Sequence, residues 1–197
     1  ASKGKLLEAA RANLGGVEVV DRTTLARGAP PNFDNAALLL LDQIAKLKDG
    51  KITLSDTKVS LSGMAREPGG REAIAAALKN LPEGYSVAAN DVKAPPYVFQ
   101  AYKDPVAVTV TLTGNVPDSN VHAALVAAAG RKVFKEKVVD NLKVSVGAPA
   151  GFANAVVTAL GALSRVSTGT LVVSDREVKL SGDALYEAAA VQIRAGL

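Results

Sequence analysis

Apolar and polar residues alternate along the chain in patterns that predict short helices and β-hairpins. In residues 33–47 the apolar positions recur every three or four residues, as on one face of an amphipathic helix, and Asn32 stands at the N-cap position. Residues 152–166 repeat this stripe. Each stripe precedes a stretch, 52–61 or 170–182, in which apolar and polar residues alternate about a Ser-Asp turn, and this predicts a half-buried β-hairpin.

The chain contains an internal duplication. Residues 1–78 slide onto residues 120–197 without a gap, at an offset of about 119 residues and with roughly 30% identity. A shorter pattern, a strand that ends in Val-x-Leu-x-Gly, occurs at 59–63, 110–114 and 178–182, each time before an Ala-rich helical stretch. The repeated unit is therefore about half of the long period, and its clearest copy has the order helix, strand, strand, helix, strand.

Fitting the chain to this αββαβ unit divides it into four segments. Residues 29–95 form a complete unit, 96–148 lack the first helix, 149–197 lack the last strand, and 1–28 supply a helix and a strand. We expect the strand near 17–26 to pair with an orphan sheet edge, in the same chain or in a second copy, because unpaired edges recruit strands. The predicted fold class is α+β, with tandem units whose small mixed sheets are each covered by helices on one face.

Few side chains in this sequence can carry out catalysis. The chain has no cysteine and one histidine, His122, which excludes thiolate nucleophiles, disulfides and metal sites built on several histidines. His122 is predicted in the first turn of a helix, where the helix dipole disfavours a protonated imidazole. Asp56 and Asp175 stand at the two hairpin turns, where Asp accepts hydrogen bonds from local backbone N–H groups. We therefore expect no enzyme activity, no metal and no cofactor.

Three glycines, Gly63, Gly114 and Gly182, end strands immediately before helical stretches. Each stands alone, without the further glycines or the following Lys-Ser or Lys-Thr of a phosphate-binding loop. We expect them instead to supply a positive φ or a close approach of two backbones.

Basic and aromatic residues supply the candidate contact surface. The net charge of +4 and the pI near 9.3 favour acidic surfaces, such as anionic lipid headgroups or acidic proteins. The candidate contact residues are the densest basic cluster, Arg131, Lys132, Lys135 and Lys137, and two aromatic residues on one strand face, Tyr97 and Phe99, with Tyr102 on the other face. A smaller basic cluster consists of Lys46, Lys48 and Lys51. We expect no nucleic-acid partner, because the basic residues are not interleaved with stacking aromatics.

These patterns together resemble the BON domain, named for bacterial osmotic-shock and nodulation proteins. The resemblance rests on the αββαβ order, on the Val-x-Leu-x-Gly strand end, and on a last strand of the kind seen at 138–142, and it covers nearly the whole chain. The segments 96–99, 112–117 and 147–152 are similar to the BON-like arrays that precede the peptidoglycan-binding domain in OmpA-family proteins of alpha-proteobacteria.

The resemblance implies a non-enzymatic module of the periplasm or cell envelope, within an OmpA-like membrane-associated protein. It implies contact with an anionic phospholipid surface or with other envelope proteins, and contact with peptidoglycan only through a domain outside these residues. The alternative hypothesis is a protein-interaction or oligomerisation scaffold without lipid affinity, including a homodimer formed by strand-edge pairing. Both hypotheses fit the sequence equally, and vesicle binding separates them.

Overall fold

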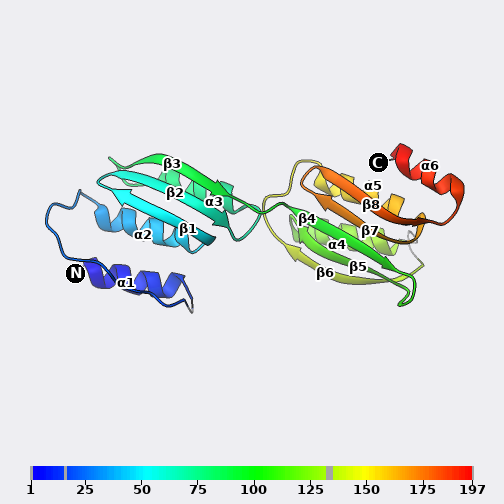
Figure 1. Cartoon of the computed structure of the whole chain (residues 1–197), viewed down its shortest axis with the longest axis horizontal. Coiled ribbons are helices and arrows are strands. Elements are labelled where there is room, and N and C mark those ends of the chain that lie inside the picture. The colour runs from blue at the N-terminus through cyan, green and yellow to red at the C-terminus, as the bar shows by residue number, and fades with distance from the viewer. Residues whose placement is uncertain (1, 16, 132–134, 197) are drawn as a thin grey trace. The chain divides into compact units, whose positions relative to one another are not determined.

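The structure, a computed structural model, describes residues 2–15, 17–131 and 135–196 and divides into two compact units, Ala1–Pro95 and Pro96–Leu197 (Figure 1). The fold is mixed α/β: the described residues contain six α-helices and two mixed sheets. Each unit has a core of its own and is described by itself.

The first unit places helices on one face of a three-stranded sheet (Figure 1). Its elements are α1 (Ser2–Asn13), α2 (Phe33–Ile44), β1 (Leu47–Ser55), β2 (Lys58–Ala65), α3 (Gly70–Ala77), the 3-10 turn η1 (Leu78–Asn80) and β3 (Ser86–Lys93). β1 and β2 form the predicted antiparallel hairpin, and β3 lies parallel to β2, so that the order is β1-β2-β3. The core lies between the sheet and the helices and includes Leu40, Leu47, Val59, Leu61 and Ile74.

The second unit is built on a five-stranded sheet. Its elements are β4 (Val98–Asp104), β5 (Thr109–Val116), α4 (Ser119–Gly130), β6 (Lys137–Val144), α5 (Phe152–Leu163), β7 (Val166–Ser174), β8 (Glu177–Ala184) and α6 (Glu187–Gly196). The strand order is β6-β5-β4-β7-β8, and α4 and α5 bury their apolar faces against one side of the sheet. β4 and β7 are antiparallel partners, so the sheet joins strands of the segments 96–148 and 149–197. The division into four BON-like segments stays a prediction.

Element bounds recur at the offset of the sequence duplication. α5, β7 and β8 begin and end at the positions that α2, β1 and β2 hold in the first copy. The hairpin turns after β1 and β7 also match, since Asp56 and Asp175 both adopt left-handed φ angles, of 53° and 52°. Corresponding elements of the two units can therefore be compared position by position.

The three glycines predicted to end strands lie two residues before the ends of β2, β5 and β8, and they have the predicted backbone conformation. Gly63, Gly114 and Gly182 have φ angles of 143°, 101° and 155°. A Cβ on any of the three would lie 2.2–2.3 Å from a backbone oxygen of the neighbouring strand. The prediction of a positive φ with a close backbone approach is therefore confirmed at all three positions.

The N-cap residues of α2 and α4 differ in whether their side chains cap the helix. Asp118 caps α4, because its Oδ1 accepts the backbone N–H groups of Asn120 and Val121, both at 2.8 Å. Asn32 stands at the N-cap of α2, as predicted, but it has a left-handed φ of 61° and its side chain makes no cap hydrogen bond.

The predicted strand at 17–26 does not form. Residues 17–30 have no regular secondary structure and return alongside α1 toward the start of α2 (Figure 1). The repeat equivalent of this segment, β6, is a strand because it pairs with β5. No strand lies next to residues 17–26 in the described part of the first unit, so their backbone lacks a ladder to join.

Candidate functional site

The predicted basic cluster lies at one end of the second unit, where α4 ends and β6 begins. Arg131 follows the last turn of α4, and Lys135 and Lys137 lie just before and at the start of β6. All three residues are exposed, whereas Lys132 lies outside the described residues. At its described positions the cluster is therefore a solvent-facing cationic surface.

The loop between β4 and β5 lies beside this cluster. Lys137 donates its backbone N–H to the carbonyl of Val108 at 3.0 Å. Asp104 closes the loop by accepting the N–H groups of Val106 and Ala107, at 2.8 and 3.1 Å. Val106 and Val108 are 92% and 55% exposed, and Val108 has a φ of 52°, which is unfavourable for a β-branched residue. A strained loop with two exposed apolar side chains is thus bonded to the start of β6, where Lys137 lies.

A buried ion pair supports this end of the unit. Lys103 Nζ lies 3.1 Å from Glu136 Oε1, and the two side chains are 7% and 14% exposed. Burial of Glu136 opposes its charged form, but backbone hydrogen bonds and the bond from Lys103 outweigh burial and lower its pKa. Because Glu136 stands between Lys135 and Lys137, the ion pair fixes the backbone that carries both exposed lysines.

The predicted aromatic contact residues lie in the core instead. Tyr97 and Phe99 are 1% and 0% exposed, and both rings meet Phe152 of α5 edge to face. The Tyr97 hydroxyl donates to the carbonyl of Ser145 at 2.9 Å, and burial raises the pKa of Tyr97 to about 12. The prediction that these two side chains form a contact surface is wrong, because α5 covers their face of the strand. Tyr102, on the other face, is exposed.

His122 belongs to a clamp between α4 and β6. Its Nε2 lies 2.7 Å from Asp140 Oδ2, and Asp140 Oδ1 accepts the backbone N–H of Leu142 at 3.0 Å. Burial opposes ionisation of Asp140, but the bonds from Leu142 and His122 outweigh it and lower the pKa of Asp140. Among the residues that the structure describes, no three His, Cys, Asp or Glu side chains are grouped to hold a metal ion.

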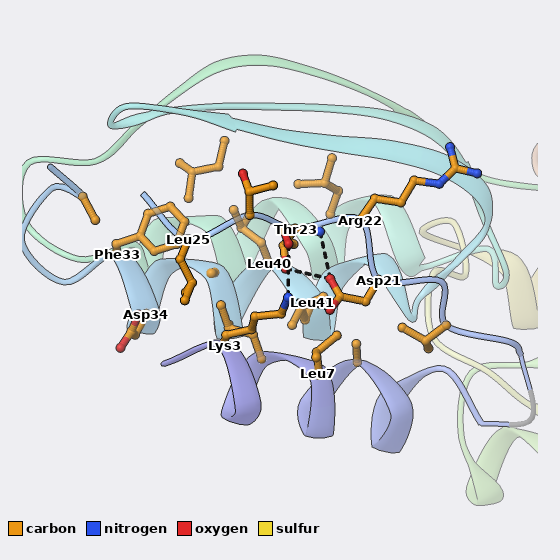
Figure 2. Close-up of a pocket in the computed structure, with 18 of the residues that line it drawn as sticks. Lys3, Leu7, Asp21, Arg22, Thr23, Leu25, Phe33, Asp34, Leu40 and Leu41 are labelled. Carbon is orange, nitrogen blue, oxygen red and sulfur yellow. Dashed lines mark hydrogen bonds and ion pairs between the residues drawn. The ribbon is translucent and has the colours of Figure 1, made fainter. Parts of the chain in front are cut away.

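The first unit contains a groove that the sequence patterns do not reveal. It has a volume of about 650 Å³ and is lined by α1, the segment 17–29, α2 and β1 (Figure 2). The lining is mainly apolar and includes Leu7, Leu25, Phe33, Leu41 and Ile52. Its polar contacts gather where Lys3 of α1 meets Asp21 and Thr23 (Figure 2).

These polar contacts hold the segment 17–29 against α1. Lys3 Nζ lies 2.8 Å from Asp21 Oδ2 and donates to the carbonyl of Thr23 at 3.1 Å. Asp21 Oδ1 accepts the backbone N–H and the hydroxyl of Thr23, at 2.8 and 2.6 Å. The bond from Lys3 and the two bonds from Thr23 hold the pKa of Asp21 well below its usual range.

The clamps of the two units are equivalent in the duplicated sequence. The first consists of Lys3, Asp21 and Thr23, and the second of His122, Asp140 and Leu142 at the same repeat positions. In both, the aspartate ties a helix to the segment that follows and accepts a backbone N–H from two residues further on. The duplication aligns the two aspartates, but lysine and histidine are different residue types, so only the structure reveals the shared contact.

A BON-like domain is detected at residues 106–145. These residues run from the β4–β5 loop through α4 and β6, and they include the basic cluster and the second clamp. No curated protein and no solved structure matches the chain. Within the described residues, none of the helices has the length and apolar character needed to span a bilayer.

Proposed function

We propose that the chain is a non-enzymatic module of the cell envelope that docks on anionic phospholipid surfaces. The docking surface is one end of the second unit, consisting of Val106, Val108, Arg131, Lys135 and Lys137, and we call it the loop end. The observation that supports this proposal is that the loop with the exposed Val106 and Val108 is bonded, through the Val108 carbonyl, to the exposed Lys137 of the basic cluster. BON domains are envelope-associated and are thought to bind phospholipids, and the BON-like match covers the loop end.

The physical argument combines two weak attractions. Each basic residue close to an anionic leaflet contributes about 1 kcal/mol, and salt screens this attraction. Val106 and Val108 can leave water for the interfacial region, at roughly 25 cal/mol per Å² of apolar surface buried. Because peripheral docking by one signal alone is marginal, the two together account for reversible binding to a charged surface.

We further propose a periplasmic location within an OmpA-like membrane-associated protein. This part of the proposal is supported by the resemblance of the segments 96–99, 112–117 and 147–152 to the BON-like arrays of that family. Envelope proteins that pair with its strand edges are further candidate partners.

Co-sedimentation with vesicles of neutral or anionic lipid tests the loop end. We expect binding to anionic vesicles at low salt and release at high salt. Substituting Arg131, Lys135 and Lys137 by Gln should weaken binding roughly 100-fold, as three charges at about 1 kcal/mol each predict. The matched control changes Lys46, Lys48 and Lys51 to Gln, which removes the same charge from the first unit and should leave most of the binding.

An equal loss in both variants would show that net charge and not the loop end matters, and would contradict the proposal. Absence of binding to anionic vesicles at low salt would also overturn it. The alternative, a protein-interaction scaffold without lipid affinity, would then be favoured, and it has a structural feature of its own in the open edge of β1 beside the groove.

A further inference from the structure

We propose that the groove of the first unit is the binding site for a β-hairpin with apolar residues at alternate positions, which pairs with the free edge of β1. This proposal goes beyond lipid docking, because the groove lies in the first unit and the loop end in the second.

The second unit shows what fills the equivalent place. In its sheet, β6-β5-β4-β7-β8, the strands β7 and β8 hold the repeat positions of β1 and β2. The segment 17–26 aligns with β6, and the clamp of Lys3 and Asp21 holds it against α1 as His122 and Asp140 hold β6 against α4. α1 packs on α2 as α4 packs on α5. Where the second unit has the hairpin β4–β5, the first unit has the groove.

β1 directs unpaired backbone groups to this side. The two-residue turn at Asp56 makes Ser55 and Lys58 the closing pair, so alternate residues of β1 bond to β2. The residues between them, Ile52 and Leu54, therefore direct their N–H and C=O groups to the open edge. Their repeat equivalents in β7 pair with Ala101 and Phe99 of β4, while no strand of the described residues pairs with this side of β1. These unpaired groups are a template for an incoming strand.

The side chains that line the groove favour apolar residues in the hairpin that binds there. Ile52 and Leu54 are half-buried, whereas their equivalents Leu171 and Val173 are 0% and 1% exposed under the β4–β5 hairpin and α5. The hairpin residues that complete that core are Phe99 and Ala101 in β4 and Val110 and Leu112 in β5. A β-hairpin with apolar residues at alternate positions of both strands fits the groove of the first unit in the same way.

Asp56 offers a charged acceptor for the start of the hairpin. In the second unit, Asp175 Oδ1 accepts the backbone N–H of Tyr97 at 2.9 Å, and the backbone N–H of Asp175 donates to the Tyr97 carbonyl at 2.9 Å. Asp56 holds the same turn position with the same left-handed φ, and its exposed carboxylate has no such partner within the described residues. A hairpin that docks on β1 presents a backbone N–H to this carboxylate, which is a charge-assisted hydrogen bond.

The experiment uses the full chain and, as probe, a fluorescent synthetic peptide of residues 96–117, which contains the β4–β5 hairpin. We expect saturable binding by fluorescence anisotropy, and NMR hydrogen exchange in which the amides of Ile52 and Leu54 become protected. Ile52→Glu should weaken binding at least about tenfold, because it puts a charge in the apolar groove. The matched control Thr53→Glu changes an exposed residue on the opposite face of β1 and should keep the affinity within about twofold.

A second probe tests the same contact from the side of the hairpin, so that the result does not depend on the folding of a variant. In this peptide the residues at positions 99, 101, 110 and 112 are serine, and we expect no binding. Equal binding of both peptides, protection at β7 instead of β1, or no saturable binding would overturn the proposal. Displacement of the bound peptide by a free fatty acid that itself binds in the groove would also overturn the proposal, since the groove would then be a site for an acyl chain. Vesicle binding by the loop end should be unchanged in Ile52→Glu, so the two proposals fail separately.

Discussion

β1 and β7 hold the same position in the duplicated sequence, yet one is an edge strand and the other lies inside a sheet. Ile52 and Leu54 of β1 are half-buried, while the equivalent Leu171 and Val173 of β7 are almost fully buried. The residue types are nearly the same at each position, so the difference arises from the neighbour: β4 covers the edge of β7, and no strand of the described residues covers that of β1.

The second strands of the two hairpins show the reverse pattern. Val59 and Leu61 of β2 are 0% and 2% exposed, because β3 lies alongside and α3 packs nearby. Val178 and Leu180 of β8 are half-buried at the open edge of the second sheet. Neither unit is therefore packed more loosely throughout. Burial follows the presence of the next strand, position by position.

The largest expected effect comes from truncating these equivalent leucines and isoleucines. Leu171→Ala should lower the free energy of unfolding of the second unit by about 3 kcal/mol, and Ile52→Ala that of the first unit by about 1 kcal/mol, because the cavity is enclosed only in the first case. The order should invert for β2 and β8, with Leu61→Ala costing more than Leu180→Ala. Urea unfolding followed by NMR in each unit measures all four. Equal losses within either pair would contradict the role of the neighbouring strand.

Glycine substitution separates backbone fit from side-chain burial. A Cβ at Gly63 or Gly182 would lie 2.3 or 2.2 Å from a carbonyl oxygen of the paired strand. Gly63→Ala should therefore destabilise the first unit by about 2 kcal/mol. Gly182→Ala should cost about the same, because in each clash one of the two strands is an edge strand, β1 or β8, that can shift away. Thermal melts of the two variants test this equality, and a clearly larger loss in one of them would show that its edge strand is held more rigidly.

Substituting the two turn aspartates, Asp56 and Asp175, should give a smaller difference in stability between the two units. Asp175→Ala removes the acceptor for the Tyr97 N–H and should cost about 1 kcal/mol more than Asp56→Ala, since both substitutions share the loss of the favoured left-handed turn residue. Urea midpoints of the two variants measure the difference. If the hairpin peptide is present, the two costs should converge, because Asp56 then has the equivalent partner.

The sequence patterns predict which helices and strands form better than they predict which of these elements lie next to one another. Helical stripes, the Ser-Asp turns and the single glycines near strand ends are local signals, and the structure has a helix, a hairpin or a tight approach at each. The pairing of β4 with β7 is non-local, and it decides that Tyr97 and Phe99 are buried under α5 and not exposed. The strand expected at 17–26 from the match to the repeated unit fails for the same reason, since a segment forms a strand only where a ladder is available. Charge density did locate an exposed cluster, because long basic side chains stay in solvent wherever they lie.

The smallest expected effects come from the two clamps, which make equivalent contacts although only the second holds a segment that also belongs to a sheet. The folded-state pKa values of Asp21 and Asp140 are both lowered, so each clamp stabilises the fold above the unfolded-state pKa near 3.8 and is lost as the pH falls through the folded-state value. Asp21→Asn should therefore speed limited proteolysis within residues 17–29 several-fold at neutral pH, and should remove most of its acid dependence. Asp140→Asn should leave β6 resistant, because β6 also pairs with β5 along its length. Equal proteolysis of both segments would show that pairing with β5 does not protect β6 once its clamp is lost. Faster proteolysis of 17–29 alone would show that this segment depends on Asp21 for its place beside the groove.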